Sequence, residues 1–415
     1  MLDERRRRDS VRCPMNDRER MLAAVAGVPA DGLPWAPRMD LWMIAQQARG
    51  SLPAELRGAN TVELARHFGV ACHAVRGDFT APRDPRDWIL RGFGIENHPD
   101  FPYRVEVSGL PLEFAAEDGL FRTTIRTAAG DVTTVLEMTP AMRRDGMSIP
   151  FVRKRPIETP ADFEPVAQVF EHLEVVPTPA AYAAFHARIG EHGLAVANGP
   201  IAASPIHLVL HDLMEMEPFI YLYVDEPAAL QRFAERLVPF FEAALEALLQ
   251  CEAEVVWWGA NYDHHVTWPA FFRDEIVSWL LATGDRLRQN GKLLASHADG
   301  ENQMLLPLFP GCRLDIAESV CAAPMTGNTL AELRAGMGTT TTIWGGIPSV
   351  ALLDGSMDEP GFAAYLDSVF GDLGTGERLI LGVSDNVPPD ANLDRLDRIT
   401  RRVAEFGGVR PTSQR

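Results

Sequence analysis

The most constraining feature of this 415-residue chain is a regular alternation of short apolar runs and amphipathic, helix-length stretches from about residue 194 onward. The apolar runs lie at residues 194–197, 254–260, 292–296, 313–317, 340–344 and 378–382. The helix candidates between and after them lie at residues 227–250, 269–289, 329–336, 360–372 and 392–406. Parallel strands joined by crossover helices produce this alternation. The sequence therefore predicts about six strand-and-helix units.

Earlier segments extend the same pattern toward the N-terminus. Helices are predicted at residues 15–26 and 61–68, and short strands at 33–38 and 70–74. With these the count of strands reaches eight, so we expect an α/β fold of the (β/α)₈ TIM-barrel type. Such barrels remain one domain at this length, and the domain is predicted to cover residues 15–410. Residues 1–14 are expected to be a disordered N-terminal extension.

Residues 103–138 interrupt the alternation. Four segments of alternating polar and apolar residues follow one another there, at 103–107, 112–116, 120–127 and 132–138. The pairs Asp118-Gly119 and Gly130-Asp131 supply the turn residues that hairpins need. We expect an antiparallel hairpin insertion between two barrel units, placed so that it covers the mouth of the barrel.

The composition limits the classes of partner. The formal net charge is −18, which repels a phosphate backbone, and the dense basic run is confined to residues 5–8. No window reaches the roughly 18 consecutive apolar residues of a membrane span. Five scattered cysteines without a CxxC pair suit reduced thiols. We expect a cytoplasmic protein that has no disulfides and binds neither nucleic acid nor membrane.

The candidate site residues are the polar side chains that follow predicted strands, because these ends converge at one mouth of a barrel. Five of them are predicted to bind a small-molecule substrate: Arg38, Asn198, Asn261, Tyr262 and His264. Arg38 ends the first predicted strand, where it either clamps a substrate carboxylate or forms a surface ion pair.

His297 and Asp299 form the sharpest local signal, in the run Ser-His-Ala-Asp-Gly that ends at Gly300. They either bind a divalent metal, act on substrate as an acid/base pair, or cap the next helix and pack the rim. Asp385 follows the last strand and is either a site carboxylate or the N-cap of the final helix. Glu318 is either a further site carboxylate or the partner of an arginine. We predict His297, Asp299 and Asp385 as catalytic.

Four segments, in this order, resemble the uroporphyrinogen decarboxylase superfamily, which includes cobalamin-dependent methyltransferases. They are residues 17–25 (DRERMLAAV), residues 223–227 (YVDEP) before a long helix, residues 297–300 (HADG), and residues 379–382 (LILG) before a Pro-rich turn. The resemblance runs over nearly the whole chain, and it implies the same barrel and a homodimer.

Two departures from the superfamily motifs bear on function. The decarboxylase carries Trp-x-x-Arg-Gln-Ala-Gly-Arg, whose two arginines grip porphyrin carboxylates, whereas only the first, Arg38, is present here. The methyltransferases bind zinc through His-x-Cys and a later Cys, and these cysteines are replaced by Asp299 and by Asp385, or Ser384 if the register slips. The resemblance then implies an oxygen-rich site of His297, Asp299 and Asp385, completed by Glu318, for Zn²⁺, Mn²⁺ or Fe²⁺.

The resemblance implies, first, a metal-assisted methyltransferase that passes a methyl group from a small oxygen- or nitrogen-linked donor to a corrinoid on a carrier protein. The alternative is a cofactor-independent decarboxylase of a small aromatic, heterocyclic or tetrapyrrole acid, in which Arg38 holds the carboxylate and an aspartate stabilises a protonated ring. A third hypothesis is a non-catalytic protein that binds a corrinoid or tetrapyrrole.

Overall fold

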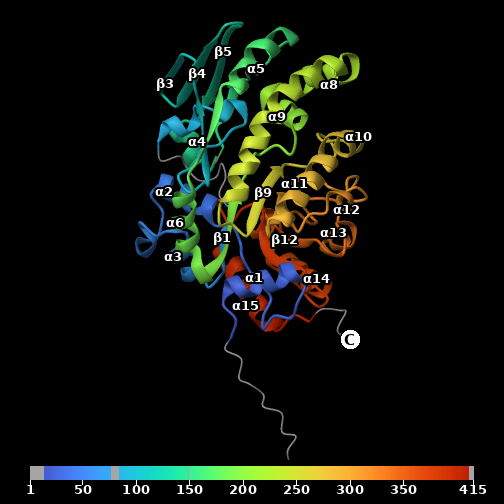
Figure 1. Cartoon of the computed structure of the whole chain (residues 1–415). Helices are drawn as coiled ribbons and strands as arrows, with labels where there is room; N and C mark the ends of the chain where they lie inside the picture. The colour runs from blue at the N-terminus through green and yellow to red at the C-terminus, as the bar shows by residue number, and fades with distance from the viewer. Residues whose placement is uncertain (1–13, 76–83, 148, 411–415) are drawn as a thin grey trace, which may run out of the picture.

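The computed structural model describes residues 14–75, 84–147 and 149–410, and a curled parallel sheet of seven strands lies at its centre (Figure 1). The strands pair in the order β1 (Cys72–Ala74), β8 (Gly193–Asn198), β9 (Val255–Ala260), β10 (Leu293–His297), β11 (Ile316–Val320), β12 (Thr342–Pro348) and β13 (Leu379–Ser384). Nearly all their residues are buried, which explains why their sequences are continuously apolar. The predicted α/β class is confirmed, and the arrangement is that of a TIM-like fold.

Helices separate the strands as the alternation predicts, and Figure 1 shows them around the sheet. They are α1 (Asp17–Ala26), α2 (Asp40–Arg49), α3 (Thr61–Phe68), α4 (Pro140–Arg144), α5 (Phe163–Glu171), α6 (Pro179–Ile189), α7 (Pro205–Leu208), α8 (Met216–Asp225), α9 (Pro227–Gln250), α10 (Pro269–Phe271), α11 (Ser278–Gln289), α12 (Phe309–Cys312), α13 (Leu330–Gly336), α14 (Glu359–Asp372) and α15 (Leu393–Phe406). Two π-helical segments, η6 (Val209–Leu213) and η7 (Phe272–Val277), follow α7 and α10.

Local capping residues set the helix ends. Asn16 and Glu19 form a capping box at the start of α1, and Gly27 ends that helix at a φ of 65°. The left-handed conformation at this C-cap is open to glycine without steric cost. The strand predicted to start at residue 313 starts later, at Ile316, as β11. Arg313 instead forms the left-handed C-cap of α12, with a φ of 49°.

The strand predicted at residues 33–38 is reduced to a single bridge between Trp35 and Leu381. The backbone N–H of Ala36 donates to Leu381 at 2.8 Å, and that of Ala71, just before β1, donates to Trp35 at 2.8 Å. The segment thus contacts both edges of the sheet. Pro34 and Pro37 lack the N–H groups that a regular ladder uses, which accounts for the missing strand.

The insertion forms two small antiparallel sheets (Figure 1). Strands β3 (Leu112–Glu117), β4 (Leu120–Thr127), β5 (Gly130–Glu137) and β6 (Phe151–Lys154) form one, as the hairpin signals predict for the first three. The segment predicted at 103–107, β2 (Tyr103–Val107), pairs instead with β7 (Leu173–Pro177). That partner lies far along the chain, beyond the reach of a local hairpin pattern.

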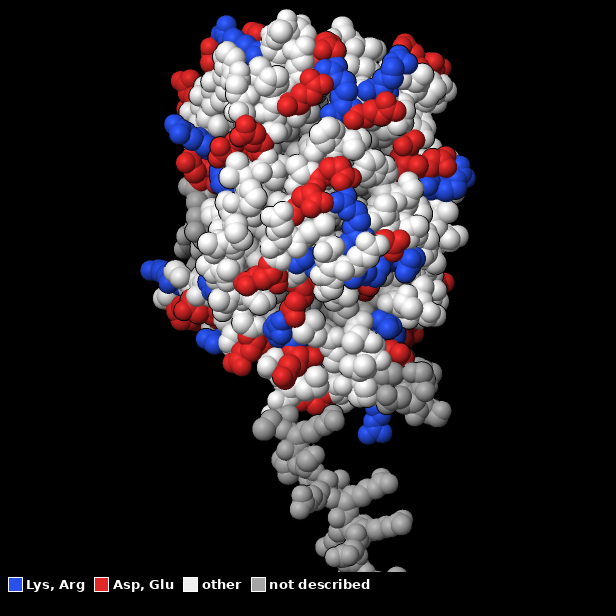
Figure 2. All heavy atoms as spheres, viewed as in Figure 1, with Lys and Arg blue, Asp and Glu red and all other residues white. Residues whose placement is uncertain are grey.

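The surface mixes charges of both signs. On the face drawn in Figure 2, acidic and basic side chains are interspersed. Several surface charges form ion pairs, such as Arg236 with Glu164 and Glu171. Among the described residues, no helix is both long and apolar enough to cross a membrane.

Candidate active site

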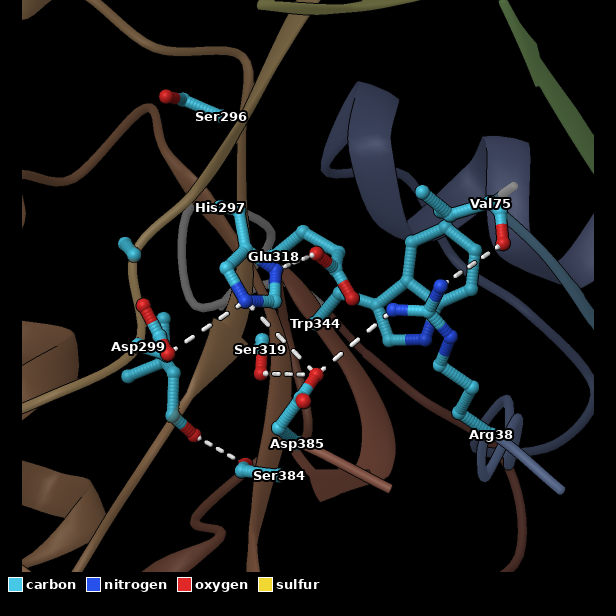
Figure 3. A network of polar contacts seen from close by, with 12 residues as sticks. Arg38, Val75, Ser296, His297, Asp299, Glu318, Ser319, Trp344, Ser384 and Asp385 are labelled. Atoms are coloured by element: carbon cyan, nitrogen blue, oxygen red, sulfur yellow. Dashed lines mark hydrogen bonds and ion pairs between the residues drawn. The ribbon is translucent and has the colours of Figure 1, made fainter. Parts of the chain in front are cut away.

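Four of the predicted residues meet at the carboxyl end of the sheet. His297 is the last residue of β10, and it lies directly opposite Glu318 of β11 in the parallel register. Asp299 follows two residues after β10, and Asp385 follows the last residue of β13. Because parallel strands present their carboxyl ends at the same edge, these side chains converge there (Figure 3).

The His297 ring has one closed side and one open side. Its Nδ1 lies 2.5 Å from Oε2 of Glu318, a side chain that is 1% exposed. Its Nε2 lies 3.6 Å from Oδ2 of Asp299 and 3.7 Å from Oδ1 of Asp385, whose side chains are 31% and 29% exposed. Figure 3 shows the ring standing between Glu318 and the two aspartates. Nε2 is therefore the nitrogen that faces the partly exposed aspartates.

A second histidine, His73 of β1, contacts the other oxygen of Glu318. The distance from its Nε2 to Oε1 of Glu318 is 3.0 Å, and both side chains are buried. Burial lowers the pKa of His73 and outweighs the opposing effect of Glu318. A neutral His73 thus donates its Nε2–H, and Glu318 accepts hydrogen bonds from two imidazoles. A single histidine in a three-residue strand carries no sequence signal for this role.

The charges around His297 keep it protonated. Burial alone would lower the pKa of His297, but the negative charges of Asp299 and Glu318 and the hydrogen bonds to them hold it well above its usual value. Burial likewise opposes ionisation of Glu318, yet the charge of His297 and hydrogen bonds from both histidines hold its pKa far below the usual range. At neutral pH the pair is an imidazolium and a carboxylate.

Burial raises the pKa of Asp385, and the nearby carboxylates Asp299 and Glu318 add to this effect, although His297 and Arg38 oppose it. Asp385 therefore takes up a proton more readily than an ordinary aspartate does. Its Oδ1 lies on the same side of the His297 ring as Nε2, 3.7 Å from that nitrogen.

The paired shifts predict how stability depends on pH. The raised pKa of His297 contributes stability that is complete below the unfolded value of about 6.5 and is lost as the pH rises through the folded value. The lowered pKa of Glu318 contributes stability above about pH 4.3, which is lost only in stronger acid. We expect the free energy of unfolding to fall as the pH rises from about 6.5, and to do so less in His297→Gln. Urea titrations between about pH 5.5 and 9 measure this, with the exposed His172→Gln as control. Equal slopes in wild type and His297→Gln would contradict it.

Arg38 lies beside this cluster and is buried, so it is not a surface ion pair. One of its terminal nitrogens donates to the carbonyl of Val75 at 3.4 Å, and the other lies 3.7 Å from Oδ1 of Asp385. Asp40 lies 4.0 Å from its Nε. The guanidinium is thus engaged with the protein's own acceptors.

Asp385 is not the cap of the last helix. The N-cap of α15 is Asn392, whose side-chain oxygen accepts from the backbone N–H of Asp394 at 3.0 Å. The carboxylate of Asp385 instead accepts from Asn386 at 2.9 Å and from Ser319 at 3.4 Å. Asp385 therefore lies in the cluster around His297 and does not cap the final helix.

Two variants separate these roles. Asn392→Ala removes the cap and is expected to cost about 0.5–2 kcal/mol of stability. Asp385→Asn removes a charge that its burial disfavours, as its raised pKa indicates, so we expect no loss of stability at neutral pH. Chemical unfolding of both variants measures the difference. A loss in Asp385→Asn equal to that in Asn392→Ala would assign Asp385 a structural role.

The remaining predicted binding residues differ in position. Asn198 is buried at the end of β8. Asn261 follows β9, and its backbone N–H donates to the carbonyl of His297 at 3.1 Å. Tyr262 is fully buried, and its hydroxyl bonds to Ser296, which makes its contacts those of a core side chain. His264 lies in the same loop, 2.9 Å from the carbonyl of Glu301.

The structure brings the residues of the implied metal site together only in part. Oδ1 of Asp299 is buried and has no hydrogen-bond partner, so it is free to take a ligand. Glu318, however, lies on the Nδ1 side of His297, opposite Asp299 and Asp385, and cannot join them around one ion. Among the described residues, no three His, Cys, Asp or Glu side chains are placed to hold an ion.

The overall fold has a counterpart among solved structures. A methyltransferase from Methanosarcina mazei superposes with a TM-score of 0.55, over 94% of this chain and 99% of that chain, at 15% sequence identity. No protein-family model and no curated protein sequence matches the chain. At this identity the likeness establishes a shared fold and leaves the chemistry to the side chains described above.

Proposed function

We propose that this protein is a methyltransferase that takes a methyl group from a small oxygen- or nitrogen-linked donor and passes it to a reduced corrinoid on a carrier protein. The observation that carries the proposal is the His297 imidazolium, whose Nδ1 is held by the buried Glu318 and whose Nε2 faces the open side of the site. The shared fold with a methyltransferase adds support.

A general acid is what such a donor requires. The bond between the methyl carbon and an ether oxygen or amine nitrogen breaks with difficulty when the heteroatom leaves without a proton. In the proposed step the heteroatom takes the proton from Nε2 of His297 as this bond breaks, and the methyl carbon bonds to the acceptor. A positioned acid contributes about 10²–10⁴-fold. A proton from water then restores the imidazolium, and the carboxylate of Asp385 on the same side of the ring favours that charged form.

The charges of the cluster favour a donor without carboxylates. Arg38 and His297 carry positive charge, but Asp299, Asp385 and Glu318 surround them, and Arg38 is already engaged with Asp385. A carboxylic acid substrate would meet these carboxylates with little free positive charge to bind it. Methyl transfer therefore agrees better with the site than decarboxylation of a small acid or a tetrapyrrole.

The test is direct. The purified chain is mixed with cob(I)alamin and a panel of methoxy and N-methyl compounds, and methylcob(III)alamin is followed by absorbance while the demethylated product is identified by mass. We expect transfer from at least one donor. Absence of methylcob(III)alamin with every donor would contradict the proposal, and a carboxylic acid panel that releases CO₂ would favour the decarboxylase. Ligand binding that survives His297→Ala, without turnover of any compound, would favour a binding protein.

A further inference from the structure

A second polar cluster lies near the first and plays no part in the step above. His211 and Asp212 lie on the π-helical segment η6, which follows β8, and Nδ1 of His211 lies 2.6 Å from Oδ2 of Asp212. The other oxygen of Asp212 accepts from Arg91 at 2.9 Å. Nε2 of His211 lies 2.6 Å from the side-chain nitrogen of Asn261. The cluster thus links the loops after β8 and β9.

The hydrogen bonds define where the protons are. The amide nitrogen of Asn261 can only donate, so Nε2 of His211 accepts. Nδ1 then carries the proton and donates it to Asp212. Burial alone would raise the pKa of Asp212, but His211 and Arg91 outweigh it and hold the pKa far below its usual range. The carboxylate of Asp212 accepts from Nδ1, and the contact with the Asn261 amide gives Nε2 the acceptor role.

The cluster is built like a binding site. The side chains of Asp212 and Arg91 are 5% and 6% exposed, whereas that of His211 is 18% exposed. His211 is thus its reachable end. Asn261 has a φ of 61°, a conformation that is uncommon outside glycine, and π-helical turns are frequent at functional sites. The backbone N–H of Asn261 also donates to the carbonyl of His297. Asn261 therefore contacts both clusters, His211 through its side chain and His297 through its backbone.

We propose that His211, held by Asp212 and Arg91, is a recognition subsite for a hydroxyl or N–H group of the methyl donor. The donor's O–H or N–H replaces the Asn261 amide as the hydrogen-bond partner of Nε2, and the amide turns to an acceptor atom of the same ligand. This inference rests on the proposed function and narrows its substrate class to small methylated compounds that also carry a hydrogen-bond donor.

Two matched probes test the subsite, 2-methoxyphenol with a hydroxyl group and 1,2-dimethoxybenzene without one. Isothermal titration calorimetry of the full chain, without methyl acceptor, measures both dissociation constants. We expect the phenol to bind about 10-fold tighter, the effect of one hydrogen bond to a positioned acceptor. His211→Phe should abolish this preference, His211→Gln should retain part of it because the amide oxygen can accept, and the remote His172→Phe should leave it unchanged.

Equal binding of the two probes, no binding of either, or a preference that survives His211→Phe would overturn the subsite. If His211→Phe does not fold, the ¹⁵N signal of His211 Nε2 in the wild-type chain replaces it, and that signal must shift with the phenol and not with the dimethoxy compound. The outcome is independent of turnover. A preference without methyl transfer keeps the subsite and removes the proposed function, and methyl transfer without a preference does the reverse.

Discussion

Replacement of His297 by glutamine is expected to lower the rate of methyl transfer by about 10²–10⁴-fold, because the variant has no acid to protonate the leaving heteroatom. The wild-type kcat/KM should fall with rising pH as His297 loses its proton, and the residual activity of His297→Gln should lack this limb of the profile. Steady-state rates over a pH series measure both effects.

The variant also breaks a buried pair, so its folded state must be verified by circular dichroism at the assay temperature. His172→Gln, which changes an exposed histidine away from the sheet end, is the matched control and should keep the wild-type rate and profile. A folded His297→Gln that transfers methyl groups at the wild-type rate would exclude His297 as the acid.

Replacement of Glu318 by glutamine is expected to destabilise the fold by about 3–5 kcal/mol, because it removes the buried carboxylate that pairs with the His297 imidazolium. The same variant removes one acceptor of the hydrogen bonds from His73 and His297. Urea unfolding at pH 7 measures the loss. Activity should fall as well, since Glu318 holds the ring with Nε2 toward the open side.

The matched control for this change is Glu242→Gln. Glu242 pairs with Arg286 on the exposed surface, where such pairs contribute about 0–1 kcal/mol. If Glu318→Gln and Glu242→Gln lose the same stability, the contact between Glu318 and His297 is not the buried ion pair described above.

The sequence predicts most of the sheet because buried parallel strands are continuously apolar. Each of the six runs from residue 194 onward overlaps a strand, from β8 to β13. The segment at residues 33–38 is equally apolar, but two prolines reduce it to one bridge. The pattern of apolar residues does not show which residues lack a backbone N–H. The partner of β2 is likewise invisible, because β7 lies beyond the hairpin insertion.

The residues of the candidate active site are partly predictable because they follow parallel strands. His297, Asp299, Glu318 and Asp385 follow strands of one parallel sheet, so topology alone brings them together. Their roles need side-chain directions, which place Glu318 on Nδ1 and the aspartates on Nε2. Candidate residues were chosen because they directly follow predicted strands. His73 lies inside the short strand β1 and His211 on the helical segment η6, so neither was selected. Tyr262 does follow a strand, but its side chain points into the core, where its hydroxyl bonds to Ser296.

The proposed function assigns activation of the methyl donor to the His297 imidazolium and not to a bound metal. The most direct measurement is the rate of methylcob(III)alamin formation by chain that has been treated with a chelator and whose metal content has been determined. We expect transfer at the untreated rate by metal-free protein, with no gain on adding Zn²⁺. Transfer that stops on chelation and returns with stoichiometric Zn²⁺ would contradict it.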